Sequence, residues 1–126
     1  MELALQTDGV LAALRVIGAV SMGETHALSD YLRVARENGA VRCVVDFSSC
    51  TELPTTIVAV LMRESAKLAE AGGVLALSGL TGQNPFLEDA AVNSRFAIYR
   101  TLDEATEEER RKSETSAHVG AQHPAP

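Results

Sequence analysis

The feature that most constrains the fold is an alternation between short runs rich in β-branched residues and longer segments with helical periodicity. Residues 41–47 (VRCVVDF) are rich in β-branched residues and bounded by turn formers, a pattern typical of a strand buried on both faces. Residues 28–35 instead place Leu28, Tyr31, Leu32 and Ala35 at the i, i+3, i+4, i+7 spacing of one helix face. Strands joined by helices return to the same end of a sheet, so the alternation predicts an α/β fold with a largely parallel sheet.

The predicted order of elements is β-β-α-β-α-β-α-β-α. An Asp-Gly turn at residues 7–9 joins the first two strands, and residues 48–54 (SSCTELP) form a loop. Capping boxes at Ser21-x-x-Glu24 and Thr101-x-x-Glu104 precede the first and last helices. We expect strands at residues 3–5, 10–20, 41–47, 74–77 and 96–99, and helices around residues 28–35, 55–71, 84–92 and 101–112. The inner stripe of the second helix is expected to be Val58, Leu61, Met62, Ser65, Leu68 and Ala69.

The length of 126 residues predicts one domain, which we place at residues 1–112. Residues 113–126 (SETSAHVGAQHPAP) lack apolar periodicity, and we expect them to form a disordered C-terminal tail.

Charge and hydropathy exclude several classes of function. The net charge of −6 argues against nucleic acid as the main partner, because phosphate binding needs a basic face. No apolar run approaches the roughly 20 residues that cross a bilayer. Glu2 stands where a signal peptide would carry positive charge, so we predict a cytoplasmic protein.

The sequence lacks the common signatures of catalysis. It contains neither a phosphate-binding loop nor a dinucleotide fingerprint, and two of its three histidines, His118 and His123, lie in the expected tail. Asp46 ends a predicted buried strand, but the other acids and the lysine of a phosphate-receiving site are missing, so we expect it to hydrogen-bond the following loop. We therefore predict no enzymatic activity, no metal and no cofactor.

One short stretch offers a regulatory site. In ELPTTIVAVLMRE, residues 52–64, Thr55 and Thr56 stand where a loop becomes an apolar helix. The first N–H groups of a helix lack partners and carry partial positive charge, so a phosphate added there would gain donors. The alternative is that a threonine only caps the helix.

Several phrases, in this order, resemble the STAS domain, the fold of bacterial anti-sigma factor antagonists. The resemblance covers roughly residues 3–112, and it implies a mixed, mostly parallel sheet of four to five strands with helices packed on it. The phrases that carry it are LRVIGAV at 14–20, VVDFSSCTELPTTIVAVL at 44–61, AGGVLALSGL at 71–80 and SRFAIYRTLDEA at 94–105.

The resemblance also implies a site. In family members that switch, a hydroxyl residue before the second helix is phosphorylated by a partner kinase. That residue falls on Thr55, with Thr56 as second candidate, while Pro54 and Ile57 stand where the motif has aspartate and glycine.

The implied function is a regulatory module that docks an anti-sigma factor or a serine/threonine switch kinase through Glu52, Pro54, Thr55 and Arg63. Its negative charge suggests a partner with a basic patch. Three alternatives stay open: a STAS subunit of an ABC-type lipid transport complex, a non-switching scaffold of a signalling assembly, and, least favoured, a nucleotide-binding protein. A homo-oligomer is also left open.

Overall fold

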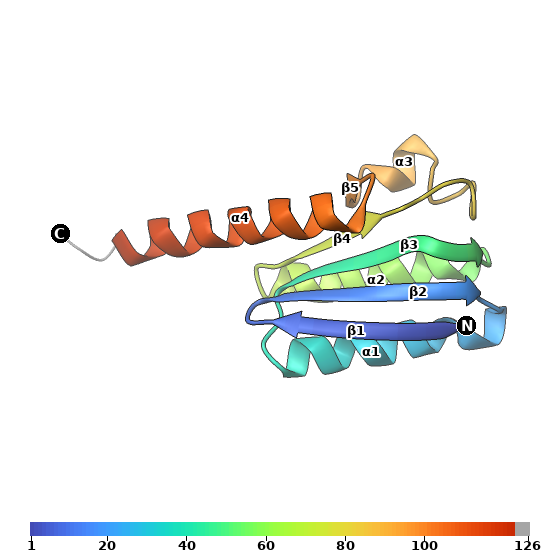
Figure 1. Cartoon of the computed structure of the whole chain (residues 1–126), viewed down its shortest axis with the longest axis horizontal. Coiled ribbons are helices and arrows are strands. Elements are labelled where there is room, and N and C mark those ends of the chain that lie inside the picture. The colour runs from blue at the N-terminus through green and yellow to red at the C-terminus, as the bar shows by residue number, and fades with distance from the viewer. Residues whose placement is uncertain (123–126) are drawn as a thin grey trace.

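The computed structural model describes the backbone of residues 1–122 and the side chains of residues 1–115. Five strands form one sheet in the order β1-β2-β3-β4-β5, with β1 antiparallel to β2 and the other neighbours parallel (Figure 1). This confirms the predicted mixed, mostly parallel α/β domain. The elements are β1 Glu2–Asp8, β2 Leu11–Ala19, η1 Met22–Glu24, α1 Thr25–Glu37, β3 Arg42–Glu52, α2 Thr56–Glu70, β4 Val74–Ser78, α3 Ala90–Asn93, β5 Ala97–Tyr99 and α4 Leu102–Gln122.

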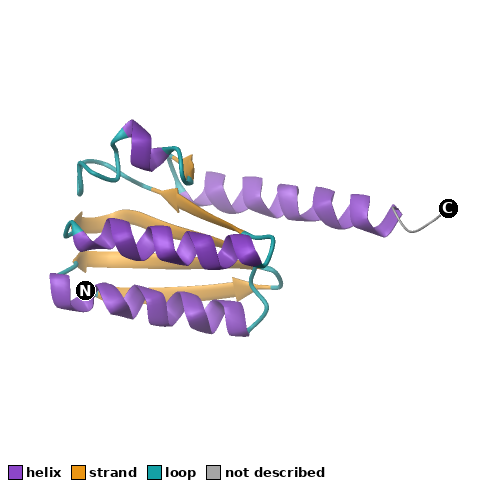
Figure 2. Cartoon of the chain, turned by 180° about the vertical axis from the view of Figure 1, so that it is seen from behind, coloured by secondary structure: helices purple, strands orange, loops and turns teal. Residues whose placement is uncertain are grey.

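The two faces of the sheet are covered unequally. Helices α1 and α2 pack side by side on one face, and α4 runs along the other (Figure 2). The main core lies under α1 and α2, because alternate residues of each strand point to that face. Its fully buried members include Leu14, Val16, Leu28, Leu32, Phe47, Ile57, Leu61, Leu68, Leu75 and Leu77. A smaller cluster of Leu11, Val44, Ala76 and Ala105 lies under α4.

The capping box at Ser21-x-x-Glu24 forms, but it caps the short turn η1 that precedes α1. The backbone N–H of Ser21 donates to the Glu24 carboxylate at 2.9 Å, and the short 3₁₀ turn η1 lies within the box. Helix α1 then begins at Thr25 and ends before Asn38-Gly39, where Gly39 takes a left-handed φ of 97°.

Two predictions for the middle of the chain were wrong. Residues 48–52 were expected in a loop, but β3 continues to Glu52, because β2 is long enough to pair with it as far as Ala19. A helix was expected over residues 84–92, but only α3 is helical there. The Asn84 side chain accepts from the Phe86 N–H and so forms a turn, and the Asp89 side chain caps α3 by accepting from Ala91.

The buried stripe of α2 is rotated from the predicted one. Ala69 is exposed, while Val58, Met62 and Ser65 are half-buried. Glu64 is fully buried because Arg36 and Lys67 pair with its carboxylate between α1 and α2. The buried residues of α2 are Ile57, Val60, Leu61, Glu64 and Leu68.

The last helix was expected to end near Lys112, but α4 continues to Gln122. Residues 123–126, with His123, lie outside the described part, and the division of the chain after residue 112 stays a prediction. Among the described residues, no helix is long and apolar enough to cross a membrane.

Candidate functional site

Three loops meet at the carboxyl ends of the parallel strands, which we call the carboxyl edge: residues 20–24 after β2, 53–55 after β3 and 79–89 after β4. The Val20 N–H donates to the Glu52 carbonyl at 2.9 Å, and the Leu53 N–H donates to the Gln83 carbonyl at 3.4 Å. These bonds hold the loops as one surface at the right-hand end of the sheet in Figure 1. This edge is where open α/β sheets commonly bind their ligands.

Two amide side chains of the loop after β4 support the end of β3 and the loop before α2. Gln83 Nε2 donates to the carbonyls of Phe47 at 2.9 Å and Gly79 at 3.1 Å. Asn84, only 1% exposed, donates through Nδ2 to the Pro54 carbonyl at 2.9 Å. The loop after β4 therefore positions the start of α2. Sequence reasoning placed Asn84 only at the start of an expected helix and missed this role, because the acceptor lies thirty residues away.

Thr55 and Thr56 occupy different environments. Thr55 is exposed, has helical φ and ψ angles of −60° and −30°, and makes no side-chain cap hydrogen bond. The Thr56 hydroxyl is buried and has no hydrogen-bond partner. The alternative in which one of these threonines caps the helix is therefore wrong, and of the two threonines only Thr55 is exposed.

The two departures from the family motif leave Thr55 accessible. Ile57 is fully buried in the core, so its bulk does not cover the surface at Thr55. Pro54 is half-buried, and its carbonyl accepts from the Ile57 N–H at 3.1 Å, which starts the first turn of α2. Positive charge from the helix dipole gathers at this turn.

The other two predicted docking residues, Glu52 and Arg63, lie in different parts of the structure. Glu52 is exposed at the end of β3, beside Pro54 and Thr55 along the chain. Arg63 lies about two helical turns further along α2 and donates to the Ser29 hydroxyl of α1 at 3.3 Å. The structure thus brings Glu52, Pro54 and Thr55 together and places Arg63 in the contact between α1 and α2.

Two large apolar side chains at the carboxyl edge were not singled out from the sequence. Met22 is 66% exposed in η1, and Phe86 is 57% exposed in the loop after β4. Exposed apolar side chains on such a surface are typical anchors for a protein partner. Neither stands in a periodic pattern, so nothing in the sequence distinguishes them from core residues.

Asp46 links the ends of β3 and β4 beneath this surface through hydrogen bonds. Its carboxylate is buried and accepts from the Ser48 hydroxyl at 2.6 Å and the Ser78 hydroxyl at 2.8 Å. Gly79 has a left-handed φ of 72°, and a Cβ there would lie 2.5 Å from the Ser48 nitrogen. The expected bonding of Asp46 to following residues is confirmed at Ser48, and the strand ends are too close for any residue but glycine.

The cysteines are not reactive groups. Both are buried, and burial raises the pKa of the Cys50 thiol and raises that of Cys43 to about 11. Within the described residues, no group of three or more His, Cys, Asp or Glu side chains could hold a metal ion.

The family model described as "Mlab, STAS domain" matches residues 3–101. The chain therefore belongs to the STAS domain family, as its sequence phrases predicted.

Solved structures agree with this assignment. An anti-sigma factor antagonist from Mycobacterium paratuberculosis is similar with a TM-score of 0.75 and 18% identity, over 86% of this chain and 93% of that one. Unphosphorylated SpoIIAA, an anti-sigma factor antagonist, has a TM-score of 0.71 and 10% identity over 87% and 98% of the two chains. The phosphorylated form of SpoIIAA, a Bacillus cell fate determinant, has values of 0.68 and 11%, over 85% and 98%. At these identities the likeness shows the fold alone. No curated protein gives a significant match.

Proposed function

We propose that this protein is a regulatory binding module of the anti-sigma factor antagonist type. It docks an anti-sigma factor or a serine/threonine switch kinase through the carboxyl edge, and phosphorylation of Thr55 controls the docking. It acts in the cytoplasm and catalyses no reaction. The observation that carries the proposal is the exposed Thr55 hydroxyl, free of any capping bond, at the start of α2.

Charge explains how the switch works. A phosphate adds roughly −1.5 to −2 charges at neutral pH. Thr55 follows the exposed carboxylate of Glu52 by three residues on a chain of net charge −6. The helix dipole stabilises the phosphate locally, and the phosphate changes the charge and shape presented between Met22 and Phe86. A partner fitted to the unmodified surface then dissociates.

Support for a second candidate comes from the matching family model, whose description is "Mlab, STAS domain" and does not mention anti-sigma factors. In this candidate the protein is the STAS subunit of an ABC-type lipid transport complex, and the start of α2 packs on an ATPase subunit. A non-switching scaffold would use the same edge, with Thr55 unmodified.

The test is a pull-down from the native host with four baits: wild type, Thr55→Ala, Thr55→Glu and Thr115→Glu. Thr115 is exposed on α4, so its glutamate adds the same charge away from the carboxyl edge. Mass spectrometry identifies the partners and measures phosphate on Thr55 in the native protein.

We expect an anti-sigma factor or kinase to bind wild type, Thr55→Ala and Thr115→Glu, and to be lost with Thr55→Glu. Recovery of an ATPase subunit instead would favour the transport complex. If all four baits bind one signalling partner equally and Thr55 carries no phosphate, the protein is a non-switching scaffold.

A further inference from the structure

The free edge of β1 is a second surface, apart from the loops that contain Thr55. β1 ends the sheet, and among the described residues no strand lies on its outer side. Natural edge strands are often protected from pairing by proline or lysine, but Glu2–Asp8 (ELALQTD) contains neither. The edge therefore keeps its capacity to pair with another strand.

The register identifies the groups on this edge. The Val10 carbonyl accepts from the Arg42 N–H at 2.9 Å. The backbone N–H and C=O groups of the even-numbered residues of β2, from Ala12, therefore point to β3, and those of the odd-numbered residues point to β1. Because Ala13 pairs with Gln6, the even-numbered residues of β1 bond to β2. The N–H and C=O groups that point outward belong to Leu3, Leu5 and Thr7.

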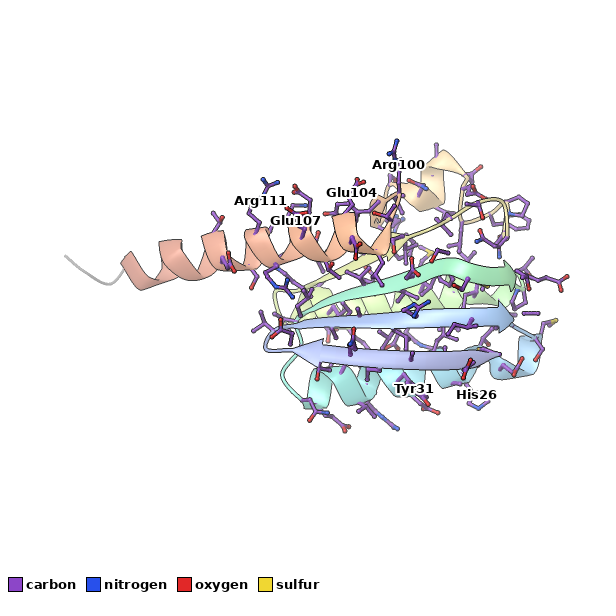
Figure 3. The ribbon with its side chains drawn as sticks, viewed as in Figure 1. His26, Tyr31, Arg100, Glu104, Glu107 and Arg111 are labelled. Carbon is purple, nitrogen blue, oxygen red and sulfur yellow. The ribbon has the colours of Figure 1, made fainter. Side chains whose placement is uncertain are left out.

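An apolar stripe of α1 lies on the same side of the molecule. Tyr31 is 40% exposed, Val34 is 43% exposed, and half-buried Ala27 completes the i, i+4, i+7 spacing. Ser29 and Arg36 contact α2 from the opposite flank of α1, so the stripe faces away from α2. Figures 1 and 2 show α1 at the β1 edge of the sheet, and Figure 3 shows Tyr31 on its outer side.

We propose that the free edge of β1 and the α1 stripe form a second docking surface, which takes up an extended segment of a partner protein as a sixth strand. A strand added about 4.8 Å outside β1 would direct every second side chain onto α1. Those side chains are apolar, because Ala27, Tyr31 and Val34 offer no charge.

The opposite face of the added strand meets acidic neighbours. Glu2 and Asp8 are exposed on that face of β1, and Asp8 is already paired with Arg110 at 2.8 Å. The basic Arg15 lies one strand further in, opposite Ala4. The segment therefore alternates apolar residues with polar ones and carries lysine or arginine opposite Glu2.

A second copy of this chain does not fit the edge. Antiparallel pairing of two β1 strands centred on Leu5 would place Glu2 of each copy opposite Asp8 of the other. Like charges directly opposite each other destabilise a strand pair. The occupant is therefore a segment of a different protein that carries basic residues at these positions.

The test uses the full chain and the synthetic peptide acetyl-Lys-Val-Lys-Val-Lys-Val-Lys-amide. Amide hydrogen exchange by NMR reports on Leu3, Leu5 and Thr7, and titration gives the Kd. The same peptide with every backbone nitrogen methylated cannot donate backbone hydrogen bonds to the edge and serves as the peptide control. Val34→Lys is compared with Ala66→Lys, since both add one charge at an exposed helix position but Ala66 lies on α2.

We expect the peptide to bind with a Kd below about 1 mM and to slow exchange at the three amides, and we expect the methylated peptide not to bind. Val34→Lys should raise the Kd about fivefold, and Ala66→Lys should raise it less than about twofold. Absence of binding, protection elsewhere, or equal effects of the two variants would overturn the proposal. Protection of these amides in the protein alone, growing with concentration, would assign the edge to a second copy instead. The result is independent of Thr55.

Discussion

At the scale of single residues, neighbours of identical type can occupy opposite environments. Thr55 and Thr56 were treated from sequence as first and second candidates for one role. The helical turn that exposes the Thr55 hydroxyl buries the Thr56 hydroxyl without a partner. A buried polar group without a hydrogen bond costs stability. Burial therefore distinguishes Thr55, which is accessible, from Thr56, whose hydroxyl is enclosed without a partner.

Replacing Thr56 with valine should leave the protein as stable or stabilise it by about 1 kcal/mol, because the methyl group fills the same space and needs no partner. Urea unfolding measures the free energy of unfolding. Thr55→Val, at the exposed neighbour, should change it by less than about 0.5 kcal/mol. A loss of more than about 1 kcal/mol in Thr56→Val would mean that this hydroxyl is hydrogen-bonded.

At the scale of elements, one buried carboxylate on α4 makes several bonds to the sheet. Glu109 is 1% exposed and accepts from Arg42 at 2.7 Å and from the Tyr99 hydroxyl, with Lys112 at 3.5 Å. Burial alone would raise the pKa of Glu109, but the hydrogen bonds from Tyr99 and Arg42, together with the charge of Lys112, lower the pKa below its usual value of 4.5. The apolar cluster under α4 is small, so this polar contact and the Arg110–Asp8 ion pair help to fix the helix on the sheet.

Glu109→Gln should destabilise the protein by about 1.5–3 kcal/mol at pH 7, since it removes charged hydrogen bonds from a buried site. A lowered pKa stabilises the fold above the unfolded value of 4.5, and this contribution is lost as pH falls through the folded pKa. The difference in unfolding free energy between wild type and variant should therefore shrink in acid below pH 4.5. A difference that stays constant with pH would contradict this account. Glu107→Gln, on the exposed face of α4, is the matched control.

At the scale of the whole molecule, the fold separates its main core from the long final helix. Among the described side chains, the last residue of α4 that bonds the rest of the domain is Lys112, which donates to the Tyr99 hydroxyl at 3.1 Å. This supports the proposal that residues 1–112 contain the folding unit, although α4 runs further.

A chain that ends at Ser113 should keep its free energy of unfolding within about 0.5 kcal/mol of the full chain, because it keeps Glu109 and Lys112. A chain that ends at Glu107 loses the Glu109 contacts and should be less stable by at least about 1.5 kcal/mol. Urea unfolding of the three chains makes the comparison. A loss of more than about 1 kcal/mol on removal of residues 114–126 would place part of that segment in the folding unit.

The strands and longer helices could be predicted because their signals are local. β-branched runs, helical spacing, the Asp-Gly turn and the capping boxes act within a few residues. These local signals give the order of strands and helices, and this order was enough to predict the mixed sheet and the family correctly. The end of β3 and the short α3 were missed because strand pairing and the side chain of Asn84 act across the sheet.

The order of elements, the class of the sheet, the family and the place of the threonine pair at the start of a helix all follow from the sequence. The folded chain was needed to show which threonine is exposed, that Glu64 and Glu109 are buried with partners, and that Met22 and Phe86 lie at the same edge as Thr55. The difference lies in the range of the interactions. Backbone propensity depends on neighbours along the chain, whereas burial and charge pairing depend on groups that only the folded sheet brings together.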